Sequence, residues 1–356
     1  MNVINFEYNR KIINNKNSAF KQQKLPAWQP MLTVDTVLPF FILLGLLFIP
    51  IGSVLLVTSQ KVQEIERNYT SCESRSHPNL NCDQVIKYNR NEPCICDFKF
   101  ELRENFRKNV YFYYGLTNYF QNHRRYVKSR DDDQLHGDLS KAPSSDCLPF
   151  DRAIDPRTNK TMPIVPCGAI ANSLFSDKFR LFYIEKNQSV EVKLSDEGIS
   201  WPTDRYIKFR NPEDPDLWAR FTRPPLWKEH MVNMKDRMRN EHFIVWMRTA
   251  ALPNFKKLWA SVNHSDIFLD GLPKGAYRLE ITYAYSVTQF KGTKRFIISN
   301  TSWMGGKNAF LGISYIVTGV LCLLLAAFFF ALNKKYKKSD SELIQLTIKT
   351  PYLPQK

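Results

Sequence analysis

The apolar stretch "TVLPFFILLGLLFIPIGSVLLVTSQ" (residues 36–60) decides the fold, because it carries no charged side chain. As an α-helix it would be roughly 37 Å long, which is enough to cross a hydrocarbon core of about 30 Å. A second uncharged stretch, "NAFLGISYIVTGVLCLLLAAFFFALN", occupies residues 308–333. Neither stretch has the polar face of a core helix, so both are predicted to be transmembrane helices, the first an uncleaved signal anchor.

Two spans place both tails on one side of the membrane and the intervening residues on the other. Lys16, Lys21 and Lys24 precede the first span, and four lysines follow the second at positions 334, 335, 337 and 338. Positively charged flanks favour the cytosol. The predicted segments are a cytosolic tail (1–35), the first helix (36–60), an exoplasmic domain (61–307), the second helix (308–333) and a cytosolic tail (334–356).

Glycosylation sequons and cysteines support this orientation. The sequons all lie between the spans, at Asn68, Asn159, Asn187, Asn263 and Asn300. Six of the seven cysteines lie there too, an even number that predicts disulfide bonds in an oxidising compartment: Cys72, Cys82, Cys94, Cys96, Cys147 and Cys167. The Cys94-Ile-Cys96 spacing is too tight for an ordinary zinc-ligand pair. Cys322 is alone in the second span.

The net charge of +16 suggests nucleic-acid binding at first sight. Its distribution argues otherwise, because residues 60–307 hold 39 basic and 30 acidic side chains. A mixed surface of this kind is typical of a solvated domain and not of a phosphate-binding stripe.

The region between the spans alternates short β-like runs with proline-rich connections. The runs are "VYFYYGL", "KFRLFYI", "SVEVKL", "YIKFR", "HFIVWM", "YRLEITYAYSV" and "KRFIIS". Several alternate apolar and polar residues, which predicts a mainly antiparallel β-sandwich with short helices and long insertions. The stretch "MRTAALPNFKKLWASV" (247–262) is expected to form a short helix broken by its proline.

Known catalytic motifs are missing from the sequence, which contains no nucleophile elbow, zinc-protease motif, phosphate loop or dinucleotide fingerprint. Residues 131–133, three consecutive aspartates, resemble the start of a calcium loop. However, the sixth position of such a loop is His136 where glycine is needed. We therefore expect no catalytic residues, no metal and no cofactor.

The spans themselves contain no ionisable side chain, so a transport role would need a partner. Small residues recur at seven-residue spacing in both, and each trio would line one helix face: Gly45, Gly52 and Ser59, then Gly312, Gly319 and Ala326. This spacing suggests a seam for a partner's helix, although glycine is also common in membrane helices. Trp28, in "FKQQKLPAWQP" (20–30), is a possible partner contact and belongs either to an interfacial strap or to an ordinary tail.

Several stretches together resemble the flippase accessory subunit family, the two-span β-subunits of type-IV P-type ATPases, also called the cell-division-control-protein-fifty or ligand-effect-modulator family. They are "FKQQKLPAWQP" (20–30), "YYGLTNYFQNHRRYVKSRDD" (113–132), "PCGAIANSLF" (166–175), "FIVWMRTAALPNFKKLW" (243–259) and "SWMGGKNAFLGISYI" (302–316). The resemblance extends from about residue 18 to residue 335.

The resemblance implies a subunit without catalysis of its own. Such a protein forms a heterodimer with the phospholipid flippase ATPase, which needs it to fold, to leave the endoplasmic reticulum and to be active. The complex would pass through the Golgi and secretory vesicles to the plasma membrane. The family's nested pairing implies disulfides Cys72–Cys96 and Cys82–Cys94, together with Cys147–Cys167. A cell-surface receptor or adhesion glycoprotein is the alternative that the sequence leaves open.

The stretch from Tyr113 to Asp133 combines aromatic, basic and acidic side chains. We expect its aromatic residues to be buried in the sandwich: Tyr113, Tyr114, Tyr119 and Phe120. Two hypotheses remain for its charges, which either pair locally or, at Arg124 and Arg125, contact the partner.

Overall fold

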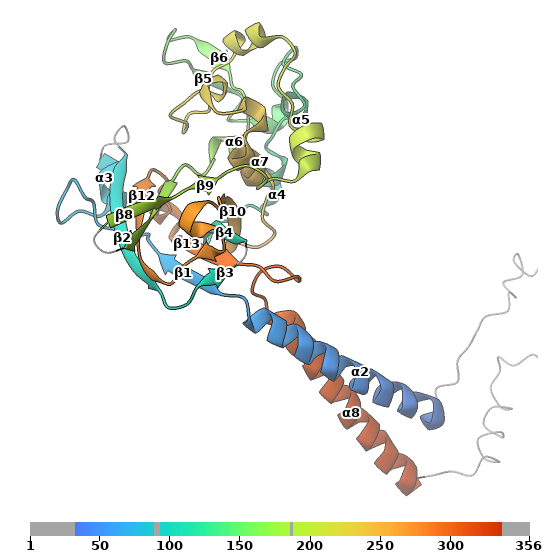
Figure 1. Ribbon diagram of the computed structural model, residues 1–356. Coiled ribbons are helices and arrows are strands. Elements are labelled where there is room, and N and C mark those ends of the chain that lie inside the picture. Colours follow the sequence, from blue (N-terminus) through green and yellow to red (C-terminus); the bar gives the residue numbers. More distant parts are fainter. Residues whose placement is uncertain (1–32, 89–92, 108, 186–187, 337–356) are drawn as a thin grey trace, which may run out of the picture. The chain divides into compact units, whose positions relative to one another are not determined.

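The computed structural model describes residues 33–88, 93–107, 109–185 and 188–336, and Figure 1 shows the chain coloured along its sequence. The chain separates into two compact units. One contains residues up to 56 and from 310 onward, and the other contains residues 57–309.

The first unit is built on two long helices, α2 (Val34–Gln60) and α8 (Phe310–Tyr336). Each has 27 residues and is long and apolar enough to cross a membrane. The two helices confirm the predicted spans. Helix α8 continues past the last apolar residues to include Lys334 and Lys335, because backbone hydrogen bonding does not end where the apolar composition ends.

The second unit contains two antiparallel sheets. The first has the order β1 (Glu64–Asn68), β13 (Lys294–Asn300), β4 (Val110–Leu116), β10 (Phe255–Val262) and β9 (Leu194–Ser195). The second has the order β2 (Cys94–Leu102), β12 (Gly275–Tyr283), β7 (Lys178–Glu185) and β8 (Gln188–Val192). Two short ribbons pair β3 (Phe106–Arg107) with β11 (Gly271–Leu272), and β5 (Arg152–Ile154) with β6 (Thr161–Pro163).

The two sheets share one aromatic core. Alternate residues of β4 are buried, including Phe112 and Tyr114, as the period of a strand requires. Phe179 of the second sheet packs against Phe296 and Trp259 of the first, with ring centroids 5.2 and 5.0 Å apart. These contacts across the two sheets make the domain a β-sandwich, as the sequence predicts.

Most of the short helices lie in two long insertions. Residues 117–177 contain α4 (Arg124–Lys128), α5 (Asp132–Leu135), η1 (Ser145–Cys147) and α6 (Ala169–Asn172). Residues 196–254 contain η2 (Asp204–Lys208), η3 (Pro215–Arg220), η4 (Met231–Asn233), η5 (Arg237–Arg239) and α7 (Glu241–Met247). The remaining elements are α3 (Cys82–Tyr88), η6 (Asp266–Phe268) and η7 (Thr288–Phe290). The insertions meet where the indole of Trp246 donates to the carbonyl of Ile170 over 2.8 Å.

Three local predictions are wrong. The run "HFIVWM" is helix α7 and not a strand, and "YIKFR" forms the π-helical turn η2 and the residues after it. Helix α7 begins where the side chain of Asn240 accepts a hydrogen bond from the amide of Phe243. Residues 243–247 are all apolar, so the run shows no helical period in the sequence, although Phe243, Ile244 and Trp246 are fully buried and Val245 is less so.

The third error concerns residues 247–262, which were expected to form a broken helix. Residues 248–254 form a loop, and Phe255–Val262 form strand β10, which pairs with β4. Tertiary pairing with an aromatic neighbour strand outweighs the helix propensity of the alanines and lysines.

Candidate partner-binding surface

The three aspartates of the 113–133 stretch make local contacts. Asp131 is buried and accepts hydrogen bonds from the amides of Gln134 and Ser144, which caps α5. Asp132 pairs with Arg130 at 2.9 Å, and Asp133 pairs with Lys141 at the same distance. For the aspartates, the hypothesis of local pairing therefore holds.

The two arginines of the stretch behave differently. Arg124 and Arg125 begin helix α4, both are exposed, and neither makes an ion pair with the residues that the structure describes. Two neighbouring guanidinium groups without an acid partner repel each other in water. They are available to a carboxylate of another molecule.

A loop from the second insertion lies beside this segment. The amide of Tyr119 donates to the carbonyl of Pro253 over 3.0 Å, and the Asn122 side chain donates to the carbonyl of Ala251 over 2.8 Å. The amide of Ala250 donates to the buried side chain of Gln121 over 2.9 Å. Residues 118–125 and 249–254, which we call the partner face, are thus fixed to each other.

The partner face combines positive charge with exposed apolar side chains. Phe120 is 55% exposed and Leu252 is 68% exposed. Neither segment of the face contains an acidic residue. The face is therefore complementary to a protein surface that offers carboxylates around an apolar patch.

Aromatic side chains beneath the face hold it in place. The hydroxyl of Tyr126 lies 2.8 Å from that of Ser173, which ties α4 to α6, and burial raises the pKa of Tyr126. The ring of Tyr119 packs edge-on against Trp246 at 5.8 Å. Tyr114 is buried and Tyr119 is half-buried, whereas Phe120 faces solvent, so its expected burial is wrong.

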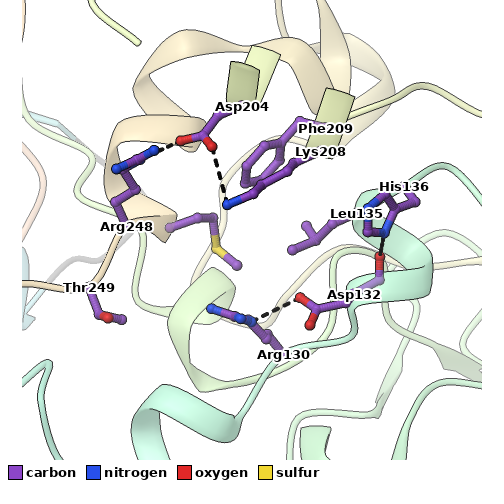
Figure 2. A pocket seen from close by; sticks show the side chains of 10 residues that line it. Arg130, Asp132, Leu135, His136, Asp204, Lys208, Phe209, Arg248 and Thr249 are labelled. Atoms are coloured by element: carbon purple, nitrogen blue, oxygen red, sulfur yellow. Dashed lines mark hydrogen bonds and ion pairs between the residues drawn. The ribbon is translucent and has the colours of Figure 1, made fainter. Parts of the chain in front are cut away.

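A cavity of about 430 Å³ lies next to the loop and contains mostly paired charges (Figure 2). Arg248 and Lys208 both point at the buried carboxylate of Asp204. Burial works to raise the pKa of Asp204, but the hydrogen bond from Arg248 outweighs it and lowers that pKa. Each of the three lining cations forms an ion pair within the cavity, Arg130 with Asp132 and both Lys208 and Arg248 with Asp204, so we interpret this cavity as a structural ion-pair site.

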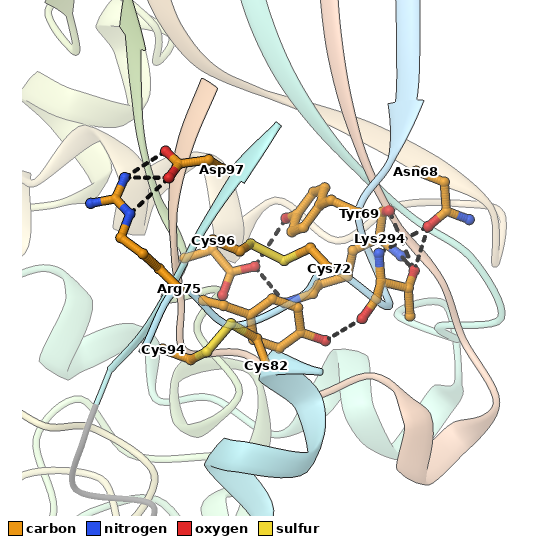
Figure 3. Close-up of a disulfide and its surroundings, with 12 residues drawn as sticks. Asn68, Tyr69, Cys72, Arg75, Cys82, Cys94, Cys96, Asp97 and Lys294 are labelled. Carbon is orange, nitrogen blue, oxygen red and sulfur yellow. Dashed lines mark hydrogen bonds and ion pairs between the residues drawn. A yellow bond between two sulfur atoms is a disulfide. The ribbon is translucent and has the colours of Figure 1, made fainter. Parts of the chain in front are cut away.

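Three disulfide bonds join the cysteines of the domain in the pairs that the resemblance implies. Cys72 is bonded to Cys96, Cys82 to Cys94, and Cys147 to Cys167 (Figure 3). The sulfur atoms of Cys72, Cys82 and Cys96 lie within 4.8 Å of one another, a separation that a metal site would also show. All three sulfurs are used in disulfides, so they are not free thiolate ligands.

Close to the nested disulfides lies a buried ion pair that the sequence analysis missed. The ammonium of Lys294 contacts the carboxylate of Asp177 at 2.6 Å, and neither side chain is exposed. Tyr69, labelled with Lys294 in Figure 3, donates its hydroxyl to the same carboxylate over 2.9 Å. Burial lowers the pKa of Lys294 to about 8 although Asp177 acts to raise it. A lysine in the β13 pattern carries no signal that it points inward.

The described sequons differ in their surroundings. Asn68, Asn159 and Asn263 are exposed. Asn300 is half-buried, and its side-chain nitrogen donates to the Gln63 side chain over 3.3 Å and to the carbonyl of Arg107 over 3.4 Å. Its oxygen accepts from the amide of Gln63 over 2.9 Å. The structure thus argues against a glycan on Asn300. Asn187 and Trp28 lie outside the described residues.

The glycine seam is occupied within the chain. A Cβ atom on Gly52 would lie 2.8 Å from the carbonyl oxygen of Gly312, and one on Gly319 would lie 2.8 Å from Ile49. Ala326 is buried as well, and the hydroxyl of Ser59 accepts from the amide of Asn308. The helices α2 and α8 therefore use this face for each other. That corrects the expectation that Gly45, Gly52, Gly312 and Gly319 present it to a partner.

Three of the histidines serve local structure. Ring nitrogens of His136, His230 and His264 hydrogen-bond to backbone atoms. In the described ranges the contacts of these rings form no array of nucleophile, base and acid. The partner face is therefore our candidate for contact with a second molecule.

The chain matches known proteins over most of its length. A family model described as "LEM3 (ligand-effect modulator 3) family / CDC50 family" matches residues 55–339. The chain is 47% identical to cell cycle control protein 50A of Bos taurus, with 91% of this chain and 90% of that protein covered. It is 42% identical to cell cycle control protein 50B of Homo sapiens, with coverage of 92% and 95%.

A plant protein is similar as well. ALA-interacting subunit 3 of Arabidopsis thaliana is 36% identical, with 88% of this chain and 84% of that protein covered. These similarities agree with the structure, which has two membrane-length helices and a disulfide-bonded β-sandwich. The chain belongs to the CDC50/LEM3 family.

Proposed function

We propose that the chain is the non-catalytic β-subunit of a phospholipid-translocating P-type ATPase, a lipid flippase. The observation that carries the proposal is the partner face, where Arg124 and Arg125 are unpaired beside the exposed Phe120 and Leu252. The name of one relative, ALA-interacting subunit 3, supports a role as the subunit of another protein.

The two membrane-spanning helices indicate which steps of transport belong to the partner and which to this chain. Residues 36–60 and 308–333 contain no ionisable side chain, and the helices pack face to face through glycines. A polar lipid headgroup that moved along these two helices would meet no charged side chain to stabilise it. ATP hydrolysis and lipid movement are therefore assigned to the partner, and the β-subunit supports its folding, its exit from the endoplasmic reticulum and its activity.

The proposed topology has both tails in the cytosol and the β-sandwich on the exoplasmic side. Its support is the exposure of Asn68, Asn159 and Asn263 and the presence of three disulfides, which form in oxidising compartments. The complex would travel through the Golgi and secretory vesicles to the plasma membrane.

Co-purification tests the proposal. The full-length chain carries an affinity tag, is solubilised in mild detergent, and the recovered proteins are identified by mass spectrometry. A P-type ATPase in equal amount is the expected result. Arrival of the folded chain at the cell surface without any ATPase would overturn the proposal and favour a receptor or adhesion protein.

A further inference from the structure

A second cavity, of about 630 Å³, lies within the unit of residues 57–309 and is distinct from the partner face. Its volume is within the ~300–1,000 Å³ range of small-molecule sites. Three chain segments line it, and the residues that matter here are Thr58, Lys61, Gln63, Glu104, Arg107 and Trp303.

The chain places this cavity at the border of the membrane. Thr58 belongs to the last turn of α2, and Lys61 directly follows the helix. Trp303 precedes the start of α8 at Phe310 by only seven residues and is 78% exposed. An exposed tryptophan and a lysine at the end of a span are typical of the depth at which lipid headgroups lie.

The charges of the cavity are not compensated. Lys61 and Arg107 are exposed and make no ion pair with the part of the chain that the structure describes. Glu104 is the one acidic lining residue, and it accepts a hydrogen bond from the side chain of Gln63 over 2.9 Å. The cavity thus offers two cations, one carboxylate and an aromatic face.

The walls of the cavity are held together by hydrogen bonds. Asn300 binds the amide of Gln63 through its side-chain oxygen and the carbonyl of Arg107 through its nitrogen. Its own amide donates to the carbonyl of Gln63 over 3.1 Å. The side chain of Asn105 accepts from the amide of Lys274 over 2.7 Å. The cavity is therefore formed before a ligand arrives.

We propose that this cavity binds the headgroup of a phospholipid from the leaflet on the side of the β-sandwich. Lys61 and Arg107 contact the phosphate, because guanidinium and ammonium groups are the usual phosphate partners. Glu104 and the ring of Trp303 contact the headgroup ammonium, since carboxylates and indole faces attract such cations. The acyl chains remain in the bilayer.

The inference deepens the proposed function, on which it rests for the side of the membrane. It gives the β-subunit a lipid contact of its own at the surface where a flippase takes up lipid. Zwitterionic headgroups, which carry both a phosphate and an ammonium, fit the charges of the cavity better than anionic headgroups without an amine.

The test uses the full-length chain alone, in nanodiscs of phosphatidylcholine containing a trace of phosphatidylcholine with a photoactivatable diazirine next to the glycerol. This bilayer has no net charge, so general attraction of basic residues to it is small. After illumination, labelling is quantified on peptides that contain residues 57–63 and 301–307. Peptides from the opposite ends of α2 and α8 are the internal reference.

In the variant Lys61→Glu/Arg107→Glu, labelling of the peptides that contain residues 57–63 and 301–307 (the cavity peptides) is expected to fall about tenfold, because charge-assisted hydrogen bonds to the phosphate are lost. Labelling of the reference peptides should not change. The matched control Lys193→Glu/Arg152→Glu reverses two exposed cations outside the cavity and leaves labelling as in the wild type. Soluble glycerophosphocholine that abolishes the labelling would show that headgroup chemistry alone is sufficient.

Unchanged labelling in the Lys61→Glu/Arg107→Glu variant would overturn the inference. A second result would also overturn it: no lipid labelling of the cavity peptides in the chain alone, together with protection of these peptides when an ATPase is bound. The cavity would then be a contact site for the ATPase. Recovery of the ATPase with the same variants is measured separately. If Lys61→Glu/Arg107→Glu loses labelling but recovers the ATPase normally, the lipid site is supported. If the wild-type chain recovers no ATPase, the proposed function fails, whereas the labelling result still decides the lipid site.

Discussion

Lys294 and Asp177 form an ion pair in the interior of the β-sandwich, with the ammonium 2.6 Å from a carboxylate oxygen and both side chains fully buried. The ammonium also donates to the carbonyl of Tyr285 over 2.5 Å. The other carboxylate oxygen accepts from the amides of Ala284 and Tyr285, each over 2.7 Å. This pair fixes the end of β12 to the start of β13.

Removing one member of this pair is expected to destabilise the domain strongly. Lys294→Met leaves the charge of Asp177 buried without a counter-ion, which costs about 3–5 kcal/mol in the free energy of unfolding. The double variant Lys294→Met/Asp177→Asn recovers part of that loss, because no unpaired charge remains. Denaturant unfolding of the purified chain measures both, and equal stability of the single and double variants would contradict this account.

Charge reversal on the partner face separates binding from folding. Arg124→Glu/Arg125→Glu is expected to leave thermal unfolding unchanged, since neither side chain is paired within the described domain, and to reduce ATPase recovery by at least about tenfold. Lys99→Glu/Arg220→Glu, which reverses two exposed cations elsewhere, is the matched control. Misfolding of the first variant with a normal control would show that the arginines are structural.

Glycan occupancy should follow the surroundings of the sequons. Asn68→Gln, Asn159→Gln and Asn263→Gln are each expected to remove one glycan, seen as a mass shift after expression in a eukaryotic cell. Ser302→Ala destroys the fourth described sequon but retains the Asn300 side chain, and no shift is expected. A glycan on Asn300 would leave a single N–H where two hydrogen bonds are made.

His242 is expected to make the domain less stable at acidic pH. Burial lowers the pKa of His242, with Asp196 and Glu241 acting to raise it and Lys235 and Lys178 acting to lower it. The unfolded chain therefore binds a proton that the folded domain resists, and stability falls as the pH drops through about 6.5, by at most ~1.4 kcal/mol per pH unit. His242→Phe should flatten this part of the stability curve, and an unchanged slope would assign it to other groups.

Close packing of the two spans can be tested with cysteines. The rings of Phe48 and Tyr315 lie 5.0 Å apart, so the thiols of Phe48→Cys/Tyr315→Cys are expected to be joined by a bifunctional thiol cross-linker in membranes of a Cys322→Ala background. Adding Gly52→Leu should suppress this cross-link, because a Cβ there meets the backbone of α8. Val54→Leu, on an exposed position of α2, is the control that retains it.

The sequence predicts the spans and the strands β4, β7, β12 and β13 because their composition or alternation reflects a single environment. It fails at α7, where the unbroken apolar run of residues 243–247 shows no helical period, and at β10, whose strand form depends on pairing with β4. The partner face joins residues 118–125 to 249–254 through contacts between residues more than 120 positions apart. No local pattern encodes such a contact.

The second cavity, of about 630 Å³, could likewise be predicted only in part from the sequence. Lys61 and Trp303 could have been noticed as residues that flank apolar spans, which is where anchoring side chains occur. Glu104 and Arg107 could not, because Glu104 follows β2 and Arg107 ends β3, and both join the cavity only in the folded sandwich.

The pairing of the strands also determines when the domain can fold during synthesis. Strand β1 pairs with β13, and β2 pairs with β12, so the earliest strands need the latest ones as neighbours. While the ribosome makes the residues between them, the edges of β1 and β2 are unpaired and the sandwich cannot close. A chain that stops before Asn300 is left with open strand edges already tethered to the membrane by α2, a substrate for chaperones and degradation.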